Sequence, residues 1–258
     1  MKRLMRAFGI AAVVVPLAAA TAVAQSPSFA GSWKLNLAKS QLGGMVYSIG
    51  KTPSGMIHYS SGGFEADFDL TGKEHVMPSG VAIIGKELSP TSWELTFRMN
   101  GKTVQTEHLT VTGNSINSVA DVIGADGKTT QQKTTDTRVS GGPGFSGKWK
   151  AGEVAGATIT LKITLGGANG ITITFPEGQT TVKGSFDGKD YPVMQAGQAM
   201  KFTNAFAKVG NTIKVTGKLN GKVFTEEVYT LSADGKTLTD ESTAIATGEK
   251  TKAVFERQ

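Results

Sequence analysis

The chain contains no cysteine in its 258 residues, which excludes disulfide bonds and every thiol-based catalytic or metal site. It has only three histidines, and none lies in an HExxH or HxH pattern typical of a zinc centre. No Gly-x-Ser-x-Gly motif marks a nucleophilic serine. These absences leave few routes to catalysis, and they mean that the core alone must stabilise the fold.

Long apolar runs are also missing beyond residue 24, where none approaches the roughly 18 residues of a membrane-spanning helix. Residues 1–24 match a secretory signal peptide, with a basic start, an apolar stretch and a small-x-small cleavage site. The residues that carry this pattern are Lys2, Arg3, Arg6 and Ala22-Val23-Ala24. A membrane anchor is the alternative, but Pro16 interrupts the short apolar stretch. We expect cleavage after Ala24, a periplasmic or secreted product and no transmembrane segment.

The chain also has little excess of positive over negative charge. The formal net charge is +6, and removal of the leader with its three basic residues lowers it to +3. Such a small excess does not favour binding to nucleic acid. We therefore expect no nucleic-acid partner.

Two stretches of the chain repeat each other. A shift of 116 positions brings the Phe-x-Gly-x-Trp of 29–33 onto that of 145–149, and a shift of 120 brings Asn-Gly-Lys at 100–102 onto 220–222 and Glu107 onto Glu227. Residues 140–144, Ser-Gly-Gly-Pro-Gly, read as a short linker. The sequence therefore predicts three parts, which are a signal peptide at 1–24, a first domain at 29–140 and a second at 145–258.

Both repeats have the pattern of short strands joined by tight turns. Residues 157–165 and 211–219 alternate apolar and polar side chains with period two, which is typical of strands with one buried face. Asn-Gly and Asp-Gly dipeptides recur between such stretches and favour hairpin turns. We expect an all-β protein of two tandem antiparallel meander barrels, each with about eight to nine strands. One joint barrel or continuous sheet is the alternative. The main helical candidate, residues 35–42, is short and is expected to cover one end of the first barrel.

A Gly-x-Trp on the first strand, a meander of about eight strands and an arginine on the last strand resemble the lipocalin and fatty-acid-binding (calycin) superfamily. The opening GSWKLNLAKS also looks like that of secreted bacterial lipocalin-like proteins. In the superfamily the tryptophan closes one barrel end and the arginine packs across its ring. The resemblance implies this role for two pairs, Trp33 with Arg138 and Trp149 with Arg257.

Aromatic residues on the predicted strands are the candidate ligand-binding residues. Several are four positions apart, so both members of a pair face the same side of a strand. They are Phe64, Phe68, Trp93 and Phe97 in the first repeat, and Phe202 and Phe206 in the second. Plain core packing is the alternative. A cavity of roughly 300 Å³ or more would favour ligand binding, and a packed interior would exclude it.

Metal and acid–base sites have little support in the sequence. His58, His75 and His108 all lie in the first repeat, where a zinc site is one interpretation and scattered surface histidines the other. Neighbouring carboxylates such as Glu226 and Glu227 point to opposite faces of a strand. We therefore predict no catalytic residue, no metal and no cofactor.

The sequence favours an exported, non-catalytic protein that holds a small hydrophobic ligand in a barrel pocket. The alternative is an envelope-associated module with filled barrels that binds a protein partner through loops or sheet edges. A barrel enzyme of the isomerase or cyclase type is a third hypothesis, which an inward-facing histidine or carboxylate at a pocket floor would favour.

Overall fold

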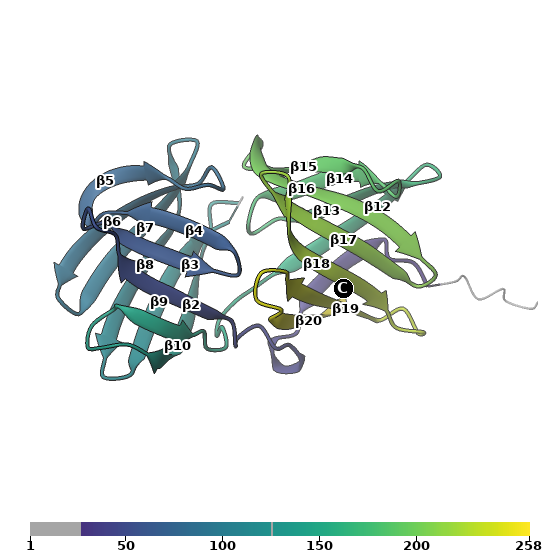
Figure 1. Ribbon diagram of the computed structural model, residues 1–258. Helices are drawn as coiled ribbons and strands as arrows, with labels where there is room; N and C mark the ends of the chain where they lie inside the picture. Colours follow the sequence, from purple (N-terminus) through teal and green to yellow (C-terminus); the bar gives the residue numbers. More distant parts are fainter. Residues whose placement is uncertain (1–26, 125) are drawn as a thin grey trace, which may run out of the picture.

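The computed structural model describes residues 27–124 and 126–258, and within them the chain forms two ten-stranded antiparallel sheets, each curled into a barrel (Figure 1). The expected all-β class and the barrels are confirmed. The strand count is ten in each, not eight or nine. The predicted signal peptide lies outside the described residues. In the described part of the chain no helix has the length and apolar character needed to cross a membrane.

Barrel 1 is the sheet with the order β4-β3-β2-β11-β10-β9-β8-β7-β6-β5. β4 and β5 are its two edges and do not pair with each other. Its strands are β2 (Val46–Lys51), β3 (Ile57–Ser61), β4 (Phe64–Phe68), β5 (Thr71–Val76), β6 (Ala82–Ser89), β7 (Ser92–Met99), β8 (Lys102–Thr112), β9 (Ser115–Ile123), β10 (Thr129–Ser140) and β11 (Gly147–Lys150).

Barrel 2 is fully closed, because β1 pairs with both β12 and β20. Full closure leaves no free strand edge. Its strands are β1 (Gly31–Leu35), β12 (Thr160–Gly166), β13 (Gly170–Phe175), β14 (Thr180–Ser185), β15 (Asp190–Gln195), β16 (Gln198–Val209), β17 (Thr212–Leu219), β18 (Lys222–Leu231), β19 (Thr237–Ala244) and β20 (Lys250–Arg257).

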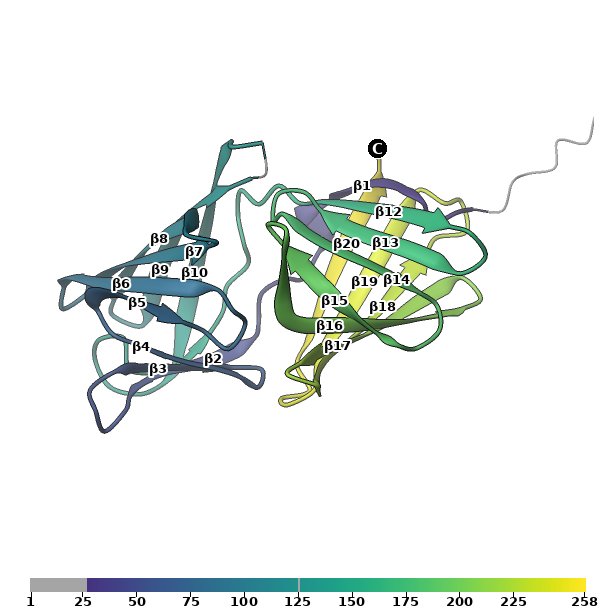
Figure 2. The ribbon, with the colours of Figure 1, turned by 90° about the horizontal axis from the view of Figure 1, so that it is seen from above.

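The two Gly-x-Trp strands are exchanged between the sequence repeats. β1, from the first repeat, completes barrel 2, and β11, from the second repeat, lies between β10 and β2 of barrel 1. Figure 2 shows β1 beside β12 and β20, far from β2 to β10. Barrel 1 is thus the continuous stretch 46–150. Barrel 2 combines β1 with residues 160–257, on either side of that stretch.

The exchange reverses the tryptophan–arginine pairs that the family resemblance implies. The Arg257 guanidinium lies 4.1 Å from the ring centre of Trp33. The guanidinium of Arg138 lies 3.9 Å from the ring centre of Trp149. The expected pairs of Trp33 with Arg138 and Trp149 with Arg257 are therefore wrong, because each tryptophan packs against the last strand of the other sequence repeat, β20 for Trp33 and β10 for Trp149.

Both ends are built in the same way. The indole N–H of Trp33 donates to the carbonyl of Phe29 at 3.0 Å, and that of Trp149 to the carbonyl of Phe145 at 2.8 Å. The glycine two positions before each tryptophan leaves room for the arginine. A Cβ on Gly31, whose φ is +151°, would lie 2.5 Å from a guanidinium nitrogen of Arg257. The glycine of the Gly-x-Trp motif is thus needed at this barrel end, because a side chain at its position would collide with the arginine.

The interiors of the two barrels differ. The interior of barrel 2 is tightly filled, and five of its large side chains have no exposed surface, namely Trp33, Leu161, Phe206, Ile213 and Leu238. In the described part of barrel 1, Trp149 alone among the large side chains has no exposed surface. The looser interior of barrel 1 is where a ligand has room.

Two segments cross between the barrels, residues 36–45 and 151–159. The first contains a short 3₁₀ helix, η1 (Leu37–Lys39), where a longer helix was expected over 35–42. Leu37 packs against the core of barrel 2 rather than covering the first barrel alone, because this segment follows β1 into barrel 2. Leu42, however, contributes to both barrels.

Candidate functional site

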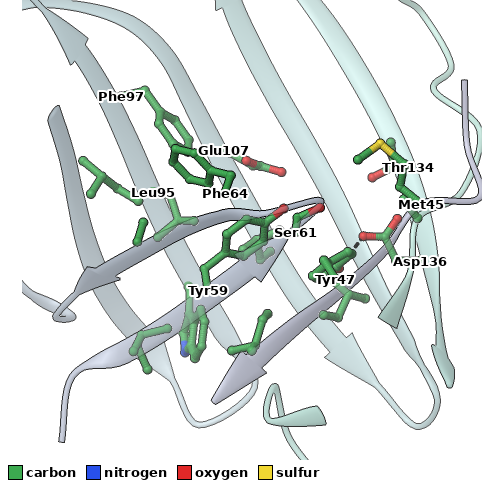
Figure 3. Close-up of a pocket in the computed structure, with 18 of the residues that line it drawn as sticks. Met45, Tyr47, Tyr59, Ser61, Phe64, Leu95, Phe97, Glu107, Thr134 and Asp136 are labelled. Carbon is green, nitrogen blue, oxygen red and sulfur yellow. Dashed lines mark hydrogen bonds between the residues drawn. The ribbon is translucent and has the colours of Figure 1, made fainter. Parts of the chain in front are cut away.

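Barrel 1 encloses a cavity of about 420 Å³, which exceeds the roughly 300 Å³ at the lower end of the range for small-molecule sites. Figure 3 shows the labelled side chains reaching into it from several strands of the barrel. The lining is mainly apolar and includes Ile49, Ile57, Ala66, Phe68, Met77, Ile83, Leu95, Leu109 and Ile116. Every inward position of β2, β3 and β4 follows the period-two alternation of a strand, which delivers these side chains to one face.

Four of the predicted ligand-binding residues lie together in this cavity: Phe64, Phe68, Trp93 and Phe97. The other two belong to barrel 2 and do not line it. Phe206 is fully buried in the packed core of barrel 2, and Phe202 lies edge-on to Phe224 with ring centres 6.0 Å apart. The spacing of aromatic residues is the same in both repeats, so it could not distinguish a lined cavity from a filled core.

One end of the cavity is closed by stacked aromatic rings. Trp93 and Phe145 stack with centroids 3.7 Å apart and an interplanar angle of 21°. Trp149 lies at the same end, and Phe145 accepts its indole hydrogen bond. Trp149, which closes this end of barrel 1, and Phe145, which accepts its hydrogen bond, both come from the second sequence repeat.

The other end of the cavity faces barrel 2. Leu42, Met45, Gly152 and Val154 of the two crossing segments line it there. The nearby turn after β7 contacts barrel 2, where the Asn100 side-chain amide donates to the carbonyl of Ala196 at 3.0 Å. A second cavity of about 380 Å³, also lined by Leu42, lies between the barrels. Access to the main cavity is therefore shaped by barrel 2.

The cavity also contains two carboxyl groups, at Glu107 on β8 and Asp136 on β10. Asp136 is only 8% exposed; it accepts a 2.5 Å hydrogen bond from the Tyr47 hydroxyl and a 3.0 Å bond from the Gly152 N–H. Glu107 accepts bonds from the Ser118 hydroxyl and, at 3.4 Å, from the Gln105 amide. Asp136 is thus held by β2 and the second crossing segment, and Glu107 by its own strand and by β9.

Burial changes the acidity of these groups. It raises the pKa of Glu107, against the opposing effect of the Ser118 hydroxyl, and the negative charge of Asp136 raises the pKa of Glu107 further. Burial also raises the pKa of Tyr47 well above its ordinary value, helped by its bond to Asp136. Burial raises the pKa of Tyr59 in the same direction. Both phenols therefore stay protonated and able to donate at neutral pH.

The sequence interpretation did not single out Glu107, Asp136 or Tyr47 as site residues. A usable signal exists for Glu107, because it shares an inward face with Leu109 and Val111 on one strand, and a carboxylate in such an apolar series is unusual. No comparable signal exists for Asp136, which follows a run of threonines and a lysine.

The three histidines do not meet. Each lies near a carboxylate instead, His58 with Asp67 at 2.7 Å, His75 with Asp69 at 2.9 Å and His108 with Glu94 at 3.9 Å. Across residues 27–124 and 126–258, no group of three or more histidine, cysteine, aspartate or glutamate side chains could hold a metal ion. The structure thus offers no described residues for a metal centre.

Barrel 2 has its own buried carboxyl pair, Glu227 and Asp240, on β18 and β19. The Tyr229 hydroxyl donates to Glu227 at 3.1 Å. Burial raises the pKa of Glu227, and burial together with the charge of Glu227 raises the pKa of Asp240 to about 8. Asp240 also lines the second cavity, between the barrels.

Comparisons with known proteins give no relative for this chain: no family model, no curated protein and no solved structure matches it.

Ala66 provides a direct test of the difference between the two interiors. It occupies the same register position in barrel 1 as Val182 in barrel 2, counted outward from the Gly-x-Trp strand. We expect Ala66→Phe to change the free energy of unfolding by less than about 1 kcal/mol, because the new ring enters a cavity. Val182→Phe should cost about 1–3 kcal/mol, because it overpacks a filled core. Denaturant titration of both variants measures this, and an equal cost for the two would contradict an open cavity in barrel 1.

Proposed function

We propose that this protein is an exported, non-catalytic carrier that holds one small hydrophobic molecule in the cavity of barrel 1. The observation that carries the proposal is the 420 Å³ cavity with its mainly apolar lining. The signal-peptide pattern of residues 1–24 and the resemblance to the lipocalin and fatty-acid-binding superfamily support export and carriage.

Barrel 2 has a different role in this proposal. Its filled interior leaves little space for a ligand and favours a structural part, in which it anchors the crossing segments at the mouth of barrel 1. The same filled interior is the observation that favours the alternative, an envelope-associated module that binds a protein through loops or sheet edges. In that case the cavity of barrel 1 would stay empty in the cell.

Native mass spectrometry of the exported protein, purified from its own host and then extracted with organic solvent, tests the proposal. We expect one bound apolar molecule per chain, and none in the Ala66→Phe variant prepared in parallel. Because Ala66 lines the cavity, its replacement by a larger ring separates a ligand inside barrel 1 from one bound elsewhere.

A wild-type preparation without ligand, combined with no change in tryptophan fluorescence on addition of fatty acids, retinoids and haem, would sink the carrier. Capture of a ligand that comes out chemically altered would instead favour an isomerase or cyclase, for which Glu107 is the inward-facing acid.

A further inference from the structure

The side chains that line the barrel 1 cavity include acidic groups but no basic group among the described residues. The residues that line it include two carboxylic acids, Glu107 and Asp136, and none of these described lining residues is lysine, arginine or histidine. A ligand with a carboxylate or phosphate head would therefore enter an apolar space without a positive partner and against two acids. Burying an unpaired charge in this way is strongly unfavourable.

Both carboxyls keep free acceptor capacity. A carboxylate has about four lone-pair sites. The hydrogen bonds to Asp136 come from Tyr47 and Gly152, and those to Glu107 from Ser118 and Gln105, which leaves about half of the sites on each group open. An ammonium group has three donors and no acceptor, which complements this arrangement.

An aromatic wall lies beside the carboxyls. Tyr47 and Tyr59 have ring centres 5.6 Å apart, and Tyr59 and Phe64 have ring centres 6.4 Å apart. Figure 3 shows Tyr47 next to Asp136, and Tyr59 and Phe64 on the side of Glu107. The faces of such rings attract cations, most strongly where water is excluded. Carboxylates and aromatic faces together form the usual surroundings of a bound amine.

We propose that the ligand of barrel 1 is an amphipathic amine, with one protonated primary ammonium head and a single apolar body. The head lies on the side of the cavity that carries Glu107 and Asp136, against the aromatic wall, and the body packs against the apolar remainder of the lining. A primary aliphatic amine has a pKa near 10 in water, so it is charged at neutral pH. The inference rests on the proposed carrier function and adds the chemical class of its ligand.

Three probes that share one ten-carbon chain and differ in the head group test the inference. They are n-decylamine, n-decanol and n-decanoate, each used below the concentration at which it forms micelles. Isothermal titration calorimetry gives the affinities, and the fluorescence of Trp93, which lines the cavity, reports occupancy. We expect decylamine to bind about tenfold or more tighter than decanoate, with decanol in between.

Variants identify the groups that recognise the head. Glu107→Gln and Asp136→Asn should each reduce the advantage of decylamine over decanol several-fold, while decanol binding shows that the cavity remains intact. Glu227→Gln is the matched control, because Glu227 is the repeat counterpart of Glu107 but lies in barrel 2. It should leave all three affinities unchanged.

The outcomes separate the inference from the function on which it rests. Equal binding of the three probes, or tighter binding of decanoate, would overturn the amine head and leave the carrier standing. Binding of none of them would overturn the carrier and the inference together. An amine preference that survives in both the Glu107 and the Asp136 variants would show that the carboxyls do not recognise the head, and would overturn the site as assigned.

Discussion

Replacing Trp149 with alanine is expected to destabilise barrel 1 by about 3–5 kcal/mol, although Trp149 belongs to the second sequence repeat. The side chain has no exposed surface, stacks under the guanidinium of Arg138 and donates to the carbonyl of Phe145. Truncation leaves a cavity at the closed end of the barrel and removes both contacts. Because Phe145 stacks on Trp93, the loss should spread to the ligand cavity.

The equivalent change at Trp33 should cost the same but act on the other barrel. Trp33 has no exposed surface and packs under Arg257, so Trp33→Ala is expected to loosen barrel 2 and leave the barrel 1 cavity intact. Denaturant unfolding gives the free energies, and hydrogen exchange followed by peptide mass analysis shows which barrel loses protection. Lys148→Ala, an exposed neighbour of Trp149, is the control for a change on the same strand.

Two results would contradict this account. A loss below about 1 kcal/mol for both tryptophan variants would show that the tryptophans do not close the barrels. Loss of protection in barrel 1 after Trp33→Ala, with barrel 2 unaffected, would show that each strand stays in its own repeat. Only the second result would restore the pairs implied by the family resemblance.

The sequence was sufficient for the fold class but not for the exchange of β1 and β11. Alternation and Asn-Gly turns specify local strands and hairpins, and both are present in the structure. The two Gly-x-Trp segments carry nearly the same residues, so either could complete either barrel. The choice depends on the crossing segments 36–45 and 151–159, whose packing between the barrels is a tertiary property that no local pattern encodes.

The candidate site was predicted in part for a similar reason. The spacing of residues such as Phe64 and Phe68 predicts which side chains point inward, and both line the cavity in the structure. It does not state whether inward-facing side chains meet and fill the space, as around Phe206 in barrel 2, or leave it open. Whether the interior is filled depends on the total volume of the inward-facing side chains from all ten strands. That total can be worked out only once the pairing of the strands is known.

Raising the pH from about 4 to about 8 is expected to lower the free energy of unfolding steadily. Asp240 has a pKa of about 8 in the folded protein, because it is buried beside Glu227, whereas an unfolded aspartate has a pKa near 3.9. Between these values the folded chain retains a proton that the unfolded chain has lost. Stability therefore falls as pH rises, by up to about 1.4 kcal/mol per pH unit for each retained proton, and levels off above pH 8.

Asp240→Asn isolates this contribution, because the amide has the shape of the protonated acid and cannot ionise. The variant should lose a large share of the slope that wild type shows in urea titrations at a series of pH values between 4 and 8. Some slope should remain, since burial also raises the pKa of Glu227 and Glu107. Glu226→Gln, an exposed carboxylate on the neighbouring strand β18, should keep the wild-type slope. Wild-type stability that rises over this range would contradict the prediction, because it would show that the carboxyls of barrel 2 are ionised in the folded protein.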